Sequence, residues 1–504
     1  MIVPGSAATA PLNLTAQIVI IGSGAGGSIV AERLARAGKD VLVLEAGPFV
    51  PAEKMNQRER DMMRLLYWEA GMRATENGSM GVLHGRGLGG STVVNYLDCF
   101  RTPQRLLERW VRTRGLPELA PEKMAPRFDH IFDVLHVRKL EESGLNPNNR
   151  KLMEGSRALG WSGDTFHRNA NNCYGSGFCD LGCAYNAKQS AAITFIPLAM
   201  AAGARVYTEV RVDRVTIEAG RAVGVEGWAL DAERRPIQPV TVRADRVIVA
   251  GGAIETPHLL LRSAVPDPSG QLGRNLHLHP GAPVVGHFPG ERIANYEGIK
   301  QGYYVGEFSW PLNGHTDDFL LEGIGAPPGI AATVFSGQGA ARQATFKHLN
   351  EYAVVGVLLR DHDTGTVTAG EGRPIINYAL SEADALRMKA AVVAAARSML
   401  AAGARVALTA HGEAQILRSE ADFDRVWSRS LTAGQMAMFS FHQMGTARMG
   451  DRRDRDVVNP EGQLWSVPGL HVADASLFPE ASGVNPQVTV YALADVVGEA
   501  IAAL

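Results

Sequence analysis

The sequence predicts an α/β protein, α+β overall, with two domains of different architecture. Residues 17–47 have the spacing of a strand, a glycine turn, a helix and a second strand. Residues 469–504 return to strand, glycine turn and helix, whereas residues 276–430 contain strand-like runs without a nucleotide fingerprint. These stretches predict a Rossmann-like, dinucleotide-binding domain joined to a substrate domain on a mostly antiparallel sheet.

The first stretch, QIVIIGSGAGGSIVAERLARAGKDVLVLEAG, has a physical reason for each glycine. Gly22 permits the tight turn, Gly24 lets the backbone approach a pyrophosphate, and Gly27 lets the helix pack closely on the sheet. The unpaired N–H groups at the start of the helix favour the phosphates. Glu45, about 20 residues after the glycines, can accept both ribose hydroxyls of an adenosine and would repel a 2′-phosphate.

Composition restricts the function classes. The chain has 504 residues, 46% of them hydrophobic and 20% charged, with a net charge of −2 and no block of basic residues. Nucleic-acid binding therefore has no electrostatic support. No apolar run approaches the ~18 residues of a membrane span. The first basic residue is Arg33, so the N-terminus lacks the charged region that a secretory or twin-arginine signal needs, and four cysteines are too few for a disulfide framework. We therefore expect a cytoplasmic protein.

The rest of the chain alternates between helical and strand-like patterns. Residues 53–73 are polar and rich in Met and Arg, which favours a helix, and the glycine-rich run GRGLGGSTVVN follows at 85–95. Such a run brings backbone close to a ligand or to another loop. Strand patterns occur at 205–230, 246–250, 283–288, 352–359 and 374–378, and a long amphipathic helix is expected at 381–402.

Four separated segments resemble the glucose-methanol-choline (GMC) family of FAD-dependent oxidoreductases, in particular its bacterial members similar to long-chain alcohol oxidases. They are the fingerprint above, GRGLGGSTVVN at 85–95, GGAIETPHLLLRS at 251–263, and HQMGTARMG at 442–450 with VADASLFP at 472–479 and NPQVTVYALAD at 485–495. The resemblance implies a discontinuous FAD-binding domain of residues 14–100, 186–275 and 431–504. Residues 276–430, with parts of 101–185, would then form the substrate domain.

The resemblance also implies the cofactor contacts. The ADP half of FAD would lie on Gly22, Gly24, Gly27 and Glu45, with adenine on the backbone of Val212. The pyrophosphate and isoalloxazine would lie along Gly90, Ser91 and Asn95, the ribityl or pyrophosphate region on Asp474, and the flavin ring against Asn485 and Gln487. Some relatives link the flavin covalently through a histidine where this chain has Val94, so we expect non-covalent FAD.

The expected chemistry is oxidation of an alcohol to an aldehyde or ketone. A hydride passes from carbon to flavin N5 while the hydroxyl loses a proton, which requires a base within hydrogen-bond reach. The resemblance assigns the base to His442 and a partner position to Asn485, which can donate to the substrate oxygen but cannot take its proton. The alternatives are a lyase or photochemical flavoprotein on the same fold, and a non-catalytic flavoprotein or partner-binding scaffold.

Cys173, Cys179 and Cys183 lie at C-x5-C-x3-C spacing among glycines. The pattern leaves three interpretations open: structural thiols, an iron–sulfur cluster and a redox disulfide. His277 and His279 would share one strand face, but no third ligand is evident, so no metal site is predicted.

Substrate and acceptor are only weakly indicated. The run 435–441, with Met436, Met438, Phe439 and Phe441, is apolar and suggests a pocket for a hydrophobic or aromatic alcohol, or else the core of a sheet. No motif distinguishes oxygen, a quinone or a protein as electron acceptor.

Overall fold

Two sheets organise the computed structural model of the chain, which describes residues 2–314, 317–334, 339–432 and 434–504. The first sheet has the order β1-β8-β3-β2-β11-β10-β9, with β21 also paired to β11. Its pairs from β1 to β11 are parallel, whereas β11, β10 and β9 form an antiparallel meander. The strands are β1 Ile2–Pro4, β2 Leu12–Ile21, β3 Val41–Leu44, β8 Arg205–Thr208, β9 Val210–Glu218, β10 Arg221–Leu230, β11 Pro236–Val249 and β21 Leu470–Val472.

The second sheet has the order β19-β18-β12-β15-β14-β13-β6 along antiparallel pairs. In addition, β20 pairs with β12, and β4 pairs with β20. Its strands are β4 Gly81–Val82, β6 Gly163–Thr165, β12 Gly281–His287, β13 Tyr303–Val305, β14 Phe319–Gly323, β15 Tyr352–Leu359, β18 Val406–Thr409, β19 Ile416–Leu417 and β20 Phe439–Ser440. Two small ribbons pair β16 Thr366–Ala369 with β17 Pro374–Asn377 and β5 Val137–Lys139 with β7 His167–Asn169.

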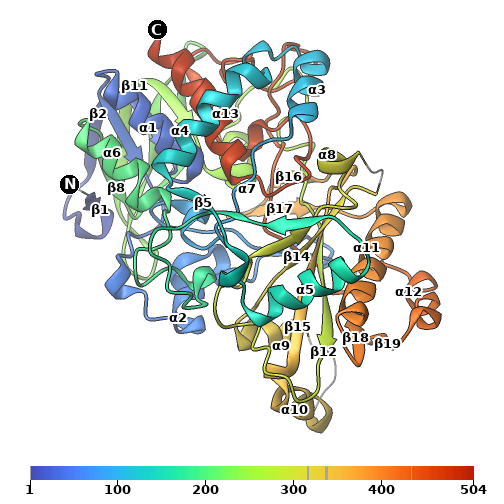
Figure 1. The fold of residues 1–504 in the computed structure, drawn as a ribbon. Helices are drawn as coiled ribbons and strands as arrows, with labels where there is room; N and C mark the ends of the chain where they lie inside the picture. Colours follow the sequence, from blue (N-terminus) through green and yellow to red (C-terminus); the bar gives the residue numbers. More distant parts are fainter. Residues whose placement is uncertain (1, 315–316, 335–338, 433) are drawn as a thin grey trace.

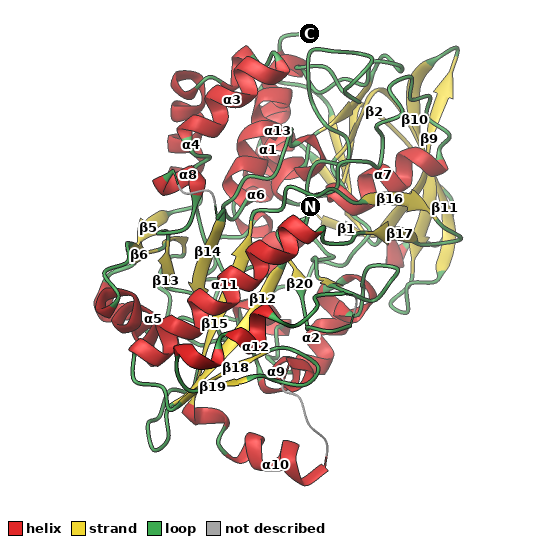
Figure 2. Cartoon of the chain, turned by 90° about the vertical axis from the view of Figure 1, so that its right-hand side faces the viewer, coloured by secondary structure: helices red, strands yellow, loops and turns green. Residues whose placement is uncertain are grey.

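Helices cover the outer faces of both sheets (Figure 1). On the first sheet, α1 packs against α13 and α6, α4 packs on α13, and α7 contacts β9. On the second, α11 packs on β12, β15 and β18 and also contacts α5 (Figure 2). The helices are α1 Ala25–Arg36, α2 Glu59–Leu66, α3 Gln104–Arg114, α4 Pro121–Val134, α5 Pro147–Ala158, α6 Phe195–Ala201, α7 Gly252–Arg262, α8 Trp310–Asn313, α9 Pro328–Val334, α10 Gly339–Lys347, α11 Glu382–Ala401, α12 Asp424–Trp427 and α13 Gln487–Ala502.

Local sequence explains the main elements. The run Val41–Leu44 is buried at every position, as expected for a strand covered on both faces. Helix α1 ends before Gly38, which adopts a φ of 77° that suits a glycine beyond a helix C-terminus. Helix α11 begins after Ser381, whose side chain accepts the Asp384 N–H, so the long amphipathic helix is confirmed. The predicted fold class is confirmed as well.

One helix prediction is wrong. Residues 53–73 do not form one helix: α2 ends at Leu66, and short 3-10 turns flank it. Glu69 and Ala70 have φ values of 48° and 55°, in the left-handed region, and a right-handed helix cannot continue through them. The break brings Arg73 into the interior, where it is 5% exposed.

The domain boundaries at 100, 186, 275 and 430 stay a prediction, and residues 315–316, 335–338 and 433 within those segments lie outside the described residues. Two short strands, β4 and β20, come from segments assigned to the FAD-binding domain but pair in the second sheet. Across the described part of the chain, no helix has both the length and the apolar character needed to cross a membrane.

Candidate active site

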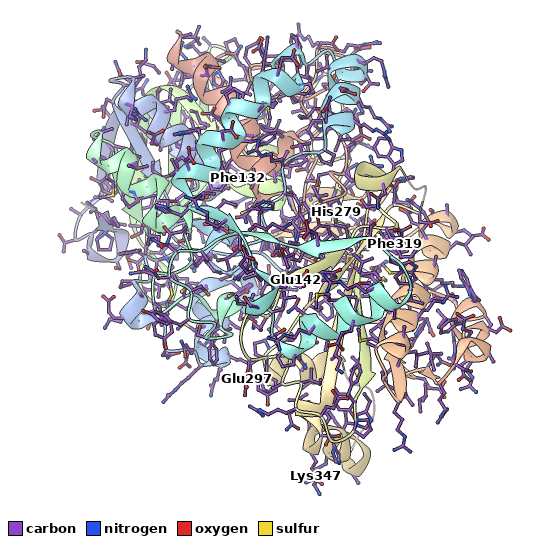
Figure 3. The ribbon with its side chains drawn as sticks, viewed as in Figure 1. Phe132, Glu142, His279, Glu297, Phe319 and Lys347 are labelled. Carbon is purple, nitrogen blue, oxygen red and sulfur yellow. The ribbon has the colours of Figure 1, made fainter. Side chains whose placement is uncertain are left out.

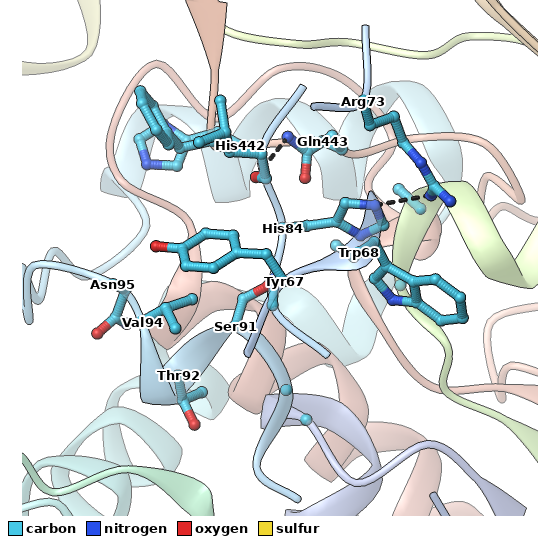
Figure 4. A pocket seen from close by; sticks show the side chains of 18 of the residues that line it. Tyr67, Trp68, Arg73, His84, Ser91, Thr92, Val94, Asn95, His442 and Gln443 are labelled. Atoms are coloured by element: carbon cyan, nitrogen blue, oxygen red, sulfur yellow. Dashed lines mark hydrogen bonds between the residues drawn. The ribbon is translucent and has the colours of Figure 1, made fainter. Parts of the chain in front are cut away.

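A cavity of about 980 Å³ is lined by residues from both sheets and from the loops that connect them. It brings together segments that are more than 450 residues apart in the chain, from Ile21 to Val490. Of the residues predicted to bind the cofactor or to act in catalysis, all but Gly27 line it: Gly22, Gly24, Glu45, Gly90, Ser91, Asn95, Val212, His442, Asp474, Asn485 and Gln487. Figure 4 shows part of this lining.

Each of the three glycines in the fingerprint is required for a different reason. At Gly22, φ is 101° and a Cβ atom would lie 2.3 Å from the Ala250 carbonyl oxygen. At Gly27, a Cβ would lie 2.1 Å from the Gly22 carbonyl oxygen, so only glycine lets α1 pack on the turn. At Gly24, a Cβ would have no protein atom nearer than 3.9 Å. Because Gly24 faces the cavity, protein packing does not explain its missing side chain, whereas close approach of a ligand does.

The second glycine run lies directly against the first. A Cβ on Gly90 would come within 2.9 Å of the Gly24 Cα, and Gly90 has a φ of 54°. The Gly89 N–H donates to Ser23 Oγ at 3.0 Å, which ties the two loops together. Ser91 Oγ accepts the Gly85 N–H at 2.9 Å. The loops therefore form one continuous backbone wall of the cavity.

Glu45 directly follows β3 and is 7% exposed. Its carboxylate accepts Ser23 Oγ–H at 2.6 Å and the Gly47 N–H at 2.8 Å. Burial raises the pKa of Glu45, and the bonds from Ser23 and Gly47 oppose that shift. These bonds fix the carboxyl group at the cavity wall, and contact of Glu45 with ribose hydroxyl groups stays a prediction.

Asp474 is tied mainly to the protein. Its two oxygens accept bonds from the Gly252 N–H at 2.8 Å, Thr256 Oγ1–H at 2.5 Å, and the N–H and Oγ–H of Ser476. These bonds hold the start of α7 beside the cavity. Direct contact of Asp474 with a ribityl or pyrophosphate group stays a prediction, because its acceptor sites already have protein donors.

Asn95 and Gln487 bond to each other. Asn95 Nδ2 donates to Gln487 Oε1 at 2.8 Å, and Gln487 Nε2 donates to the Asp98 carbonyl oxygen at 2.8 Å. The second glycine run is thereby joined to the first residue of α13, two residues after Asn485.

His442 and His279 form a pair in the middle of the molecule, where Figure 3 labels His279. Their Nδ1 atoms are 3.4 Å apart, and the rings meet edge to face with centroids 5.5 Å apart. Burial, and secondarily His279, lowers the pKa of His442 well below its usual range. Burial likewise lowers the pKa of His279 to about 4. Both rings are therefore neutral at neutral pH.

The hydrogen positions on this pair follow from the backbone. The Gly483 N–H donates to His279 Nε2 at 3.1 Å, so neutral His279 carries its hydrogen on Nδ1 and directs it at His442 Nδ1. Neutral His442 then holds its own hydrogen on Nε2. To take a proton at Nε2, His442 must first move its own hydrogen from Nε2 to Nδ1. His442 Nδ1 then no longer accepts the hydrogen bond from His279 Nδ1, which is weak at 3.4 Å.

Sequence reasoning missed two polar groups in the cavity. Arg73 contacts Glu255 at 2.5 Å and Glu69 at 2.8 Å. It also contacts His84 at 2.8 Å (Figure 4). Asp98, Gln301 and Glu322 form the second group, beside Asn485. Only Glu255 belongs to a quoted motif, and no local pattern marks the others, since their proximity arises from the fold.

The apolar run before His442 divides between two environments. Phe439 and Phe441 line the cavity, whereas Met436 and Met438 are 2% and 4% exposed in the core of the second sheet. The interpretation of both methionines as pocket residues is therefore wrong. Successive side chains of an extended chain point to opposite faces, so Phe439 and Phe441 face the cavity while Met438 faces the core.

The cysteine segment lies next to the cavity. Cys173 is exposed, Cys179 and Cys183 are partly buried, and all are free thiols. Buried Lys188 donates to the carbonyl oxygens of Cys179 and Asn95 at 2.6 Å each, so it ties this segment to the second glycine run. Within the described ranges, no group of three or more His, Cys, Asp or Glu side chains is placed to hold a metal ion.

Comparison with known proteins identifies the following similarities. The two GMC oxidoreductase family models match residues 63–281 and 361–494, and an NAD(P)-binding Rossmann-like model matches residues 20–53. An uncharacterised GMC-type oxidoreductase of Mycobacterium tuberculosis is 35% identical over 97% of this chain and 76% of its own. A long-chain-alcohol oxidase of Arabidopsis thaliana is 30% identical over 98% of this chain and 69% of its own.

Solved structures share the fold. Formate oxidase from Aspergillus oryzae superposes with a TM-score of 0.72 at 19% identity, covering 98% of this chain and 99% of its own. Pyridoxine 4-oxidase superposes with a TM-score of 0.70 at 18% identity, covering 96% of this chain and 98% of its own.

The glycine geometry predicts opposite effects for two alanine substitutions. Gly26→Ala places a Cβ 1.9 Å from the Ala473 carbonyl oxygen and should lower the free energy of unfolding by about 1–3 kcal/mol. Gly24→Ala should leave the ligand-free protein within about 1 kcal/mol of wild type, since its Cβ meets only the cavity, yet weaken dinucleotide retention. Denaturant unfolding and bound-nucleotide content check both. Wild-type retention in Gly24→Ala would contradict the assigned role.

Proposed function

This chain belongs to the GMC oxidoreductase family of FAD-dependent enzymes, and we propose that it oxidises a hydrophobic or aromatic alcohol to an aldehyde or ketone with non-covalent FAD. The observation that carries the proposal is the single cavity in which His442 and Asn485 share a wall with the glycine loops. The alcohol oxidase among the relatives supports the choice of reaction.

The residues present fit FAD. The open face of Gly24 and the backbone of Gly90 leave room for a pyrophosphate at the start of α1. Glu45 and the backbone of Val212 would hold the adenosine. The acceptor atom of Asn485, Oδ1, is buried without a partner among the described residues, so it is free to accept a hydrogen bond from a bound molecule.

The chain's own residues would manage the proton and the substrate oxygen. When bound, FAD would supply the acceptor for the hydride that leaves the substrate carbon. We assign the base to His442, which receives the hydroxyl proton at Nε2 after its own hydrogen has moved to Nδ1. Asn485 donates an amide hydrogen to the substrate oxygen as negative charge develops there. The low pKa of His442 keeps the ring unprotonated at neutral pH, as a base requires.

Apolar side chains support a hydrophobic substrate. Ile324 follows β14, Val354 and Leu358 lie on β15, and Phe439 lies on β20; all of them line the cavity. A cytoplasmic location stays an expectation. The electron acceptor, which is oxygen, a quinone or a protein, is not identified by these contacts.

Non-covalent attachment predicts that acid precipitation releases all of the yellow colour. Val94 stands where linked relatives have histidine and offers no nucleophile, although it lines the cavity. The measurement is the flavin absorbance of supernatant and pellet. Colour that stays in the pellet would exclude non-covalent binding.

His442→Ala should keep its FAD but reduce the flavin at least roughly 10²-fold more slowly when mixed anaerobically with an alcohol. Asn485→Ala should affect hydride positioning more than proton removal. Because the pKa of His442 lies well below 6.5, the wild-type rate should persist as pH falls through that value.

Stopped-flow absorbance measures these rates, with His130→Ala on the exposed face of α4 as the matched control. A parent-like rate in His442→Ala would remove the base assignment. If no alcohol bleaches the flavin, the lyase or photochemical alternative replaces the oxidation.

A hydrophobic substrate pocket predicts that kcat/KM rises along a series of alcohols of increasing chain length. Each methylene buried in the cavity should gain about 0.8 kcal/mol, or about fourfold in kcat/KM, until the pocket is full. Steady-state kinetics from ethanol upward test this. A steady fall along the series, or glucose outperforming benzyl alcohol, would reject the apolar pocket and leave the flavin chemistry standing.

A further inference from the structure

The loop of residues 480–485, the Asn485 loop, is held by two residues that flank strands of the second sheet. Arg360, directly after β15, donates from Nε to the Ala481 carbonyl oxygen at 3.0 Å. His279, two residues before β12, accepts the Gly483 N–H on its Nε2 at 3.1 Å. Of these two tethers, the His279 bond is the nearer in the chain to the amide that lines the cavity.

His279 has a backbone conformation that is uncommon for a residue with a side chain. Its φ is 47°, in the left-handed region, and Pro280 follows it. A residue before proline favours extended conformations, so the local sequence opposes the conformation that His279 adopts. Contacts from elsewhere in the fold therefore hold it.

Asp361 supplies those contacts and is 1% exposed. Its Oδ2 accepts the Leu278 N–H at 2.8 Å, and its Oδ1 accepts the His279 N–H at 3.2 Å. The Tyr378 hydroxyl donates to Oδ2 at 2.9 Å and fixes the carboxylate. Consecutive residues, Arg360 and Asp361, thus hold the Asn485 loop and the backbone of His279.

The two nitrogens of the His279 ring have different roles. Nε2 accepts the Gly483 N–H, and Nδ1 faces His442 Nδ1 at 3.4 Å. Burial lowers the pKa of His279 to about 4, so at neutral pH the ring keeps one lone pair for Gly483 and one hydrogen for His442. Because both nitrogens are engaged, neither is available to take the hydroxyl proton. His279 lines the cavity without being a second base.

We propose that His279 is a positioning residue that holds the Asn485 loop through its Nε2 and so fixes where Asn485 meets the substrate oxygen. The inference rests on the proposed alcohol oxidation. Without this acceptor the buried Gly483 N–H has no partner, and the loop moves to find one. Displacement of Asn485 weakens its bond to the oxygen on which charge develops, and a misplacement of about 1 Å can cost about 10²-fold in rate.

Two amide substitutions at His279 separate its two contacts. In His279→Gln the longer side chain carries its oxygen to the position of Nε2, where it can accept the Gly483 N–H. In His279→Asn the amide lies at the position of Nδ1, keeps a donor for His442 and is too short to reach Gly483. Asparagine also tolerates a left-handed φ, so His279→Asn removes the tether and keeps the backbone conformation.

Stopped-flow flavin reduction at increasing alcohol concentration gives the limiting rate and the apparent Kd. His279→Asn should lower the limiting rate roughly 10- to 100-fold and leave the apparent Kd within about threefold of wild type, because apolar side chains bind the alcohol. His279→Gln should recover most of the lost rate. Exposed His130→Asn on α4 is the matched control and should behave as wild type. A wild-type limiting rate in His279→Asn, or a rate in His279→Gln no higher than in His279→Asn, overturns the proposal.

A double variant shows whether His279 acts through Asn485. In Asn485→Ala the loop no longer presents an amide, so adding His279→Asn should change the limiting rate by less than about twofold. A reduction as large in Asn485→Ala as in wild type overturns the positioning role.

A readout without substrate separates this inference from the proposed function. Hydrogen exchange of the holoenzyme, followed by mass spectrometry on peptides that span residues 480–486, should be roughly tenfold faster at Gly483 in His279→Asn than in wild type. In His279→Gln it should stay close to wild type, since an acceptor remains. If exchange follows this pattern but no alcohol bleaches the flavin, the proposed function fails and the His279 tether stands. Equal exchange in wild type and His279→Asn overturns the inference itself.

Discussion

The contact between the two glycine loops at Gly24 and Gly90 determines the rest of the site. Glycine at position 90 lets these backbones meet, since a Cβ on Gly90 would lie 2.9 Å from the Gly24 Cα. That contact places Asn95 within reach of Gln487, so the last helix of the chain starts at the same wall as the first. Helices α1 and α13 then pack together, and buried Asp495 bonds Arg33 on α1 and Arg127 on α4, both at 2.5 Å.

The second sheet closes the cavity and sets its electrostatics. Its β12, β14, β15 and β20 bring apolar side chains and Glu322 toward the residues held by the first sheet. Burial there favours neutral forms: His442 and His279 have lowered pKa values, and Glu322 has a raised one. Neutral donors and acceptors at these positions suit a reaction in which charge develops on one oxygen, because oriented dipoles in a dry site act with little screening.

Local pattern was enough to predict the fold class, the helix that the structure places at 382–401 and the strand at 352–359. The motifs also named the chain segments that meet at the cavity. The helix over 53–73 failed because left-handed Glu69 and Ala70 have no sequence signal. Met436 and Met438 were misplaced since an apolar run does not reveal which face of a strand is buried. Glu322, Asp98 and Arg73 were missed because only tertiary structure brings them to the cavity.

The most direct test of the account is a crystal structure of the purified protein with its own cofactor. The account predicts electron density for FAD in the cavity, with adenosine at Glu45, the pyrophosphate at Gly24 and Gly90, and the isoalloxazine ring beside His442 and Asn485. A nicotinamide dinucleotide in the cavity, or a flavin ring remote from His442 and Asn485, would contradict it.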